Sequence, residues 1–108
     1  MTVKELANTD IFSAVALPQA EREINGVYIG DLLSWVMGRA EADNAWITIM
    51  SNNNILAVAA LADTSCIILA EGVSLEENIV KTAEEKGINI LKSDKNAYEI
   101  SVALSSML

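Results

Sequence analysis

The chain has 108 residues, of which 52% are hydrophobic and 20% are charged, and its formal net charge is −8. This apolar fraction excludes an intrinsically disordered chain, and a length of this order predicts one folded domain. Because seven basic residues are scattered among fifteen acidic ones, the composition also excludes a nucleic-acid-binding surface and disfavours binding to anionic membranes.

The first part of the chain predicts three short elements. These are a helix at 3–8, a strand at 11–17 that ends at the only proline, Pro18, and a strand at 27–29 that follows Gly26. The two strands are less regular than the later ones, which is consistent with an antiparallel pairing or with a position at the edge of a sheet.

From residue 31 onward, predicted helices and strands alternate. The helices are expected at 31–38, 53–62, 75–86 and 94–107, and the strands at 45–50, 66–70 and 88–91. The continuous apolar run at 66–70 is typical of a strand that is buried on both faces. Strand–helix–strand units with short connections predict right-handed crossovers, and therefore a three-layer α/β/α fold with a mostly parallel sheet.

Two helix ends carry specific signals. Ser74 and Glu77 have the spacing of a capping box, which predicts the start of the helix at 75–86. Gly87 predicts a left-handed cap at the end of the same helix.

Three segments resemble the corresponding parts of DRTGG-domain proteins. They are Gly26–Gly38, Ala45–Met50 and Cys66–Gly72, and the likeness extends over nearly the whole chain, 1–108. The family is similar to the N-terminal domain of bacterial HPr kinase/phosphorylases, and its members also occur fused to CBS domains. The resemblance implies a three-layer unit without catalytic residues and a regulatory role. The signature Asp-Arg-Thr-Gly-Gly itself is absent, and its place is expected near 51–54.

The residue types restrict the chemistry. The chain has no histidine and one cysteine, Cys66, so Ser–His pairs, Cys–His pairs, intrachain disulfides and cysteine-rich zinc sites are excluded. No phosphate-binding loop is present, because no glycine precedes a lysine. We expect no enzyme activity and no cofactor, and we predict that Cys66 is a buried packing residue.

The candidate ligand site follows from the predicted sheet. Ligands of open α/β sheets bind at the carboxyl ends of the strands, so the residues that follow each strand are the candidates. They are Gly30, Asp31, Ser51, Asn52, Asn53, Asn54, Glu71, Gly72 and Ser93, followed by Asp94. Asp43, Asp63 and Ser65 are expected at the opposite ends of the strands.

Each candidate has a structural alternative. The four polar residues at 51–54 either offer amide groups to a ligand or cap the following helix. Asp31 and Glu71 either form a carboxylate pair or, as we favour, Asp31 caps its helix while Glu71 is solvated. Gly72 either allows close approach of a ligand or supplies an unusual backbone angle.

The helix at 31–38 is apolar nearly all round, which predicts a second buried face. We therefore expect a homodimer with Leu33, Trp35 and Met37 as candidate interface residues, unless the segment 3–17 covers this helix. The predicted function is a non-catalytic regulatory or ligand-sensing module that binds a small molecule or a protein partner. The alternative is a purely structural homodimerisation domain. The absence of a signal-peptide-like start and of an apolar run long enough to span a bilayer predicts a cytoplasmic protein.

Overall fold

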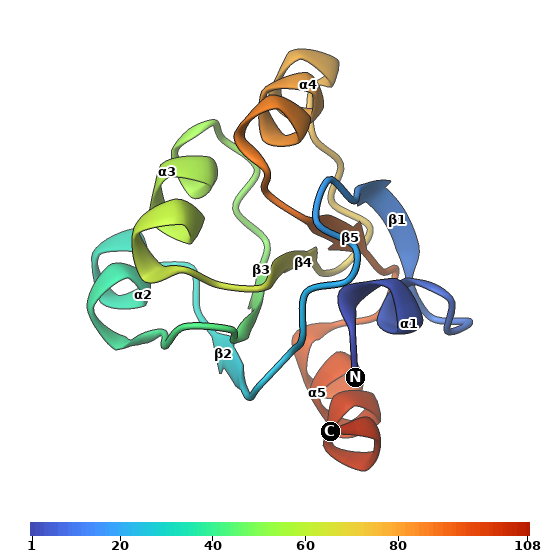
Figure 1. Cartoon of the computed structure of the whole chain (residues 1–108). Helices are drawn as coiled ribbons and strands as arrows, with labels where there is room; N and C mark the ends of the chain where they lie inside the picture. The colour runs from blue at the N-terminus through green and yellow to red at the C-terminus, as the bar shows by residue number, and fades with distance from the viewer.

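A five-stranded sheet in the order β1–β5–β4–β3–β2 forms the middle layer of the protein (Figure 1). The strands are β1 (Ser13–Ala16), β2 (Val27–Ile29), β3 (Ala45–Thr48), β4 (Cys66–Leu69) and β5 (Ile90–Lys92). The parallel strands β2 to β5 are neighbours in sequence order, and β1 pairs with β5 in the antiparallel direction. This computed structural model describes all 108 residues, and it confirms the mostly parallel sheet with two less regular strands at its edges.

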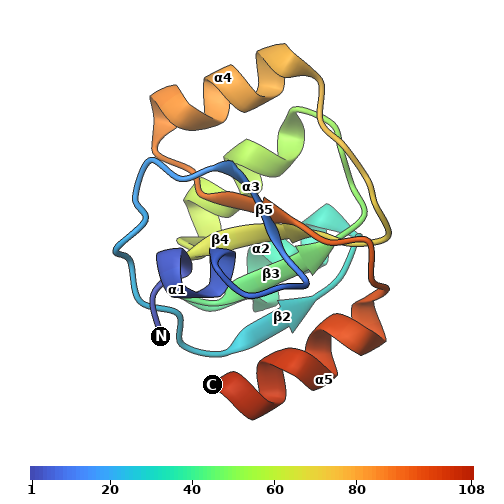
Figure 2. The same cartoon turned by 90° about the vertical axis from the view of Figure 1, so that its right-hand side faces the viewer.

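Helices cover both faces of the sheet. α2 (Leu33–Arg39), α3 (Asn54–Ala62) and α4 (Glu77–Lys86) lie on one face, and α1 (Val3–Ala7) and α5 (Ala97–Met107) lie on the other (Figures 1 and 2). Right-handed crossovers between strands that advance in one direction place all their helices on the same face. The fold is therefore the predicted three-layer α/β/α arrangement. None of the five helices combines the length and the apolar character that a membrane crossing requires.

The two faces of the sheet carry separate hydrophobic clusters. Every residue of β3 and β4 is buried, and successive side chains point to opposite faces. The side chains that pack under α2, α3 and α4 include Trp46, Ile67, Leu69 and Ile90. Those that pack against α1 and α5 include Ala45, Ile47, Ile68 and Leu91. The apolar run at 66–70 is thus buried on both faces, as the sequence predicted.

Trp46 also ties the edge strand to the sheet. Its side chain is fully buried, and its indole Nε1–H donates a hydrogen bond to the carbonyl oxygen of Gly30 at 2.9 Å. A buried indole N–H needs such an acceptor. The bond therefore fixes the end of β2 against β3.

The amino ends of the strands are joined by one guanidinium group. Arg22 donates hydrogen bonds to the carboxylates of Asp43, at 3.0 Å, and Asp63, at 2.8 Å. Both aspartates adopt left-handed backbone angles in the turns that precede β3 and β4. Asp43 and Asp63 therefore lie at the edge opposite the carboxyl ends, as predicted, and they have a structural role there.

Several helix ends differ from the sequence prediction. α4 begins at Glu77 and its N-cap, Glu76, has no side-chain cap bond, so the predicted capping box of Ser74 and Glu77 is wrong. Capping boxes form instead at α1, between Thr2 and Glu5, and at α5, between Asn96 and Glu99. The left-handed cap at Gly87 is confirmed by its φ of 76°.

The predicted alternative for covering α2 is also wrong. The segment 3–17 does not fold over this helix, because α1 packs on the opposite face of the sheet. Leu33 and Val36 of α2 face the core, whereas Leu32, Trp35 and Met37 are exposed. The side chain of Arg39 lies over the Trp35 ring, with its guanidinium carbon 3.6 Å from the ring centroid.

The Trp46 hydrogen bond gives a direct test of the fold. Trp46→Phe removes the donor and leaves the Gly30 carbonyl without its partner, so we expect a loss of about 1–3 kcal/mol in the free energy of unfolding, measured by urea denaturation. Tyr98→Phe is the control, because Tyr98 is 76% exposed and the substitution should change stability by less than about 0.5 kcal/mol. Equal losses in the two variants would contradict the assignment.

Candidate functional site

Loops from all five strands meet at one edge of the sheet. Since β2 to β5 are parallel, the segments that follow them share the carboxyl edge. β1 runs in the opposite direction, so the residues that precede it lie at this same edge, beside the end of β5. The loop after β4 leads to α4 on one face, and the loop after β5 leads to α5 on the other. Diverging loops of this kind are where crevices form in α/β sheets.

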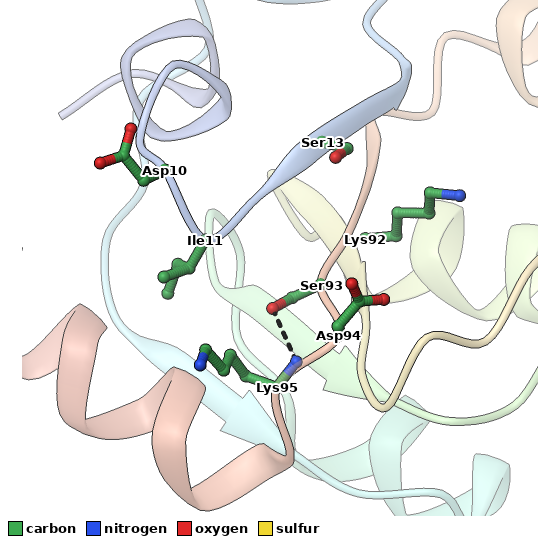
Figure 3. A pocket seen from close by; sticks show the side chains of 7 residues that line it. All are labelled: Asp10, Ile11, Ser13, Lys92, Ser93, Asp94 and Lys95. Carbon is green, nitrogen blue, oxygen red and sulfur yellow. Dashed lines mark hydrogen bonds between the residues drawn. The ribbon is translucent and has the colours of Figure 1, made fainter.

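A cavity of about 480 Å³ lies at this edge between β1 and β5 (Figure 3). It is lined by Asp10, Ile11, Ser13, Lys92, Ser93, Asp94 and Lys95. Six of these seven side chains are polar or charged, so the cavity offers cations, carboxylates and hydroxyl groups. This composition suits a polar, charged small molecule better than an apolar one.

The two lysines of the cavity form no ion pair. The four ion pairs of the protein involve the N-terminus, Lys4 and Arg22, and none includes Lys92 or Lys95. Figure 3 shows that the two lysine side chains extend to opposite sides of the loop that follows β5. In a chain with a net charge of −8, two lysines without an ion-pair partner thus line this cavity from different sides.

The wall of the cavity is held by main-chain bonds to the neighbouring loop. The Glu71 N–H donates to the Lys95 carbonyl at 2.8 Å, and the Gly72 N–H donates to the Ser93 carbonyl at 2.9 Å. The buried Ser93 hydroxyl accepts a bond from the Lys95 N–H at 3.1 Å. The loops after β4 and β5 are thus joined into one unit, which fixes the backbone of residues 93–95.

Gly72 is required by backbone geometry. Its φ is 72°, and a Cβ at this position would lie 3.3 Å from Oδ1 of Asp94. The preceding residue, Glu71, also has a positive φ, of 58°. The structure therefore supports the interpretation of Gly72 as a residue with an unusual backbone angle, placed next to a cavity residue.

Asp31 does not cap its helix, so the interpretation that we favoured from the sequence is wrong. The N-cap of α2 is Leu32, which has no side-chain cap bond. The Asp31 carboxylate instead accepts hydrogen bonds from the Thr48 hydroxyl at 2.7 Å and the Ile49 N–H at 2.9 Å. Asp31 thus joins the ends of β2 and β3. β3 lies between the strands that carry Asp31 and Glu71, and no group of three or more His, Cys, Asp or Glu side chains is placed to hold a metal ion.

The segment 51–54 lies at the same edge but does not line the cavity. Ser51, Asn52, Asn53 and Asn54 are all exposed. Asn53, the N-cap of α3, makes no side-chain cap bond, whereas the Asn52 side chain accepts a bond from the Asn54 N–H at 2.9 Å. Of the three asparagines, only Asn52 therefore uses its side chain to satisfy a main-chain N–H at the start of α3.

The cavity is displaced from the site that the sequence indicated. Of the predicted ligand residues, Ser93 and the adjacent Asp94 line it, and Gly30, Asp31, Glu71, Gly72 and the segment 51–54 do not. The residues missed from the sequence are Asp10, Ile11, Ser13, Lys92 and Lys95. Only the antiparallel pairing of β1 with β5 places the segment 10–13 at the carboxyl edge, and no local motif signals that pairing.

Cys66 is not part of any reactive site. The side chain is 1% exposed at the start of β4, and burial raises the pKa of its thiol to about 12. A thiol with such a pKa stays protonated near neutral pH, and the thiolate is the nucleophilic form. The predicted packing role of Cys66 is consistent with this environment.

The fold and the edge cavity define the class of the protein as a three-layer α/β domain with a polar crevice at the carboxyl edge of its sheet. The model of the DRTGG domain matches residues 13–107, so the chain belongs to the DRTGG domain family. A search of curated protein sequences gives no match.

The fold resembles that of a solved structure. That structure contains the CBS and DRTGG domains of the regulatory region of Clostridium perfringens pyrophosphatase, complexed with the activator diadenosine tetraphosphate. The TM-score is 0.67 at 13% sequence identity, and the likeness covers 83% of this chain and 40% of that one. The chain therefore spans less than half of the length of that regulatory region.

The backbone at Gly72 provides a test of how this edge is built. Gly72→Ala places a side chain in a left-handed conformation, in tight contact with Asp94, and we expect a loss of about 1–2 kcal/mol in unfolding free energy. Gly38→Ala is the matched control: Gly38 lies in α2 with nothing within 4 Å of an added Cβ, so alanine should stabilise the protein by about 0.5–1 kcal/mol. Chemical denaturation measures both changes, and a gain in stability for Gly72→Ala would refute the geometry.

Proposed function

We propose that this chain is a non-catalytic regulatory module that binds a small anionic molecule in the cavity between β1 and β5. The observation that carries the proposal is the pair of unpaired lysines, Lys92 and Lys95, at a polar cavity on the carboxyl edge. Ammonium groups attract carboxylates and phosphates, and Asp10 and Asp94 are acceptors for the hydroxyl groups of a ligand.

The comparisons support this proposal at the level of the family. The DRTGG domain of similar fold is part of a regulatory region that binds a nucleotide activator. That region also contains CBS domains, so the nucleotide is a reasonable probe for this chain and not its assigned ligand. We further propose a single domain over 1–108, similar to the N-terminal domain of HPr kinase/phosphorylases, and a cytoplasmic location.

Binding can be measured as a shift of the melting temperature with diadenosine tetraphosphate, ATP and inorganic pyrophosphate as probes. A ligand at ten times its dissociation constant stabilises the native state by about 1.4 kcal/mol, or roughly 6 °C for a domain of this size. We expect at least one probe to give such a shift, and Lys92→Ala and Lys95→Ala each to reduce it. Lys81→Ala is the control, because Lys81 lies exposed on α4, away from the cavity.

The absence of a shift with all three probes would argue against the anionic ligand. A shift that survives in both cavity variants would place the binding site elsewhere on the protein.

We also expect no ATP hydrolysis and no transfer of phosphate to a protein. The chain has no phosphate-binding loop, whose backbone and lysine hold the triphosphate, and no histidine, the commonest general base for activating an acceptor. Release of inorganic phosphate from ATP by the purified chain, measured against a buffer blank, would overturn this expectation.

A second candidate function is homodimerisation, and a specific observation favours it. Leu32, Trp35 and Met37 are 59%, 52% and 45% exposed on or next to α2, beside the edge strand β2. Exposed apolar groups that gather on one side of a small protein often mark an interface. These residues lie at the opposite edge of the sheet from the β1–β5 cavity, so the two functions are compatible.

A further inference from the structure

β2 is an edge strand whose outward main-chain groups are free. The Ala45 N–H donates to the Gly26 carbonyl, and the Gly30 N–H donates to the Ile47 carbonyl. Because the main-chain groups of successive residues in a strand point alternately to its two sides, Gly26, Tyr28 and Gly30 face β3. The N–H and C=O groups of Val27 and Ile29 therefore point away from the sheet.

The opposite edge of the sheet carries a bulge and a proline, and β2, a strand of three residues, carries neither. β1 contains a bulge between Ala14 and Ala16, and Pro18 follows it. Bulges, prolines and charged side chains are the usual means by which edge strands avoid pairing with another chain. β2 has none of them: its three residues are Val27, Tyr28 and Ile29.

An apolar groove runs beside this free edge. Its volume is about 250 Å³, and it lies between β2 and α5. The lining residues are Gly26, Val27, Ile29, Ser101, Leu104, Ser105 and Leu108. Ile29 is 50% exposed, and Val102 and Leu108 of the same region are 51% and 46% exposed. The groove thus continues the sheet edge on the face that α5 covers.

Few charged residues lie near this edge of the sheet. The segment 24–38 contains one charged residue, Asp31, and α5 contains one, Glu99, whereas the shorter helix α4 contains five. Two copies with a net charge of −8 repel each other, and a surface with few charges is where they can approach. Depletion of charge is also characteristic of the buried centre of protein interfaces.

We propose that two copies of this chain pair through their β2 strands in antiparallel orientation, so that one continuous sheet crosses the dimer. The pairing rests on the homodimer proposed above and specifies its contact surface. A two-fold axis at Tyr28 places Val27 of each copy opposite Ile29 of the other, and these pairs exchange about four main-chain hydrogen bonds. Asp31 then lies opposite Asn25 of the other copy, so that no like charges meet.

The groove between β2 and α5 can accommodate side chains of the second copy's β2 strand. Val27 and Ile29 point to the face covered by α5, so those of the second copy enter the groove between β2 and α5. Four hydrogen bonds between three-residue strands stabilise a dimer only weakly, so apolar contacts must provide most of the binding free energy. The exposed side chains of α2 and α5 flank the joined strands on either face and provide them.

The test is the mass of the full chain in solution, measured by light scattering. The native chain should have twice its single-chain mass of 11.6 kDa. Ile29→Pro removes one outward N–H without touching the bonds to β3, and Ile29→Lys places a charge in the groove; both should shift the protein to the monomer. Leu61→Lys is the matched control, because Leu61 is 71% exposed on α3, and it should remain dimeric.

The possible outcomes separate the two proposals. A monomeric native chain would overturn both the homodimer and the pairing. A dimer that persists in folded Ile29→Pro and Ile29→Lys variants would overturn the pairing alone. A third measurement does not depend on a variant: amide exchange at Val27 and Ile29 should slow when the chain concentration rises, and rapid exchange at both positions in the dimer would also exclude the pairing.

Discussion

The burial of β3 and β4 on both faces is the constraint on which the other layers depend. Each of their residues is at most 2% exposed, and the apolar side chains alternate between the two faces. Removing that surface from water stabilises the fold, and it requires helices above and below the sheet. The positions of α2, α3 and α4 on one face and of α1 and α5 on the other follow from it. The loops at the carboxyl edge are placed in turn by these helices, since each loop connects a fixed strand end to a fixed helix start.

The two surfaces proposed to be functional lie at opposite edge strands of the sheet. At the β1–β5 edge, the chain changes direction and passes from one face to the other, which leaves room for a polar cavity with Lys92 and Lys95. At the β2 edge, the side chains are apolar and nearly free of charge. A ligand and a second copy can therefore bind at the same time, and any influence of one on the other has to pass through the sheet or through α5. This helix begins directly after the cavity residues and ends beside the β2 groove.

Much of the fold could be predicted from the sequence because its signals are local. The apolar run at 66–70 and the alternation of elements after residue 31 specify buried parallel strands and crossover helices. The first residues of the helices were harder to predict from the sequence. Ser74 and Glu77 have the spacing of a capping box without forming one, whereas Asn96 and Glu99 form one. The cavity lies at the end of the sheet where the sequence predicted a ligand site, and it contains Ser93 of the predicted residues together with residues of the β1 side that the sequence did not indicate. Ser13 pairs with Lys92, which is far away in the chain, so no local signal reveals this contact. The Asp31 side chain likewise accepts a hydrogen bond from Thr48 of the neighbouring strand and does not cap its own helix.

The position of β1 has a consequence for the newly made chain. β2, β3, β4 and β5 are added to the sheet in the order of synthesis, so each can pair with a neighbour that already exists. β1 is the first strand of this sheet to be synthesised, yet its only partner is β5, the last strand of the same sheet. During translation, residues 13–16 therefore remain without their strand partner until residues 90–92 have been synthesised. The pairing of β1 with β5 requires closure of a long loop, which is slow compared with the formation of local contacts. The same pairing brings residues 10–13 beside residues 92–95, so the proposed β1–β5 cavity forms only after β5 has been synthesised.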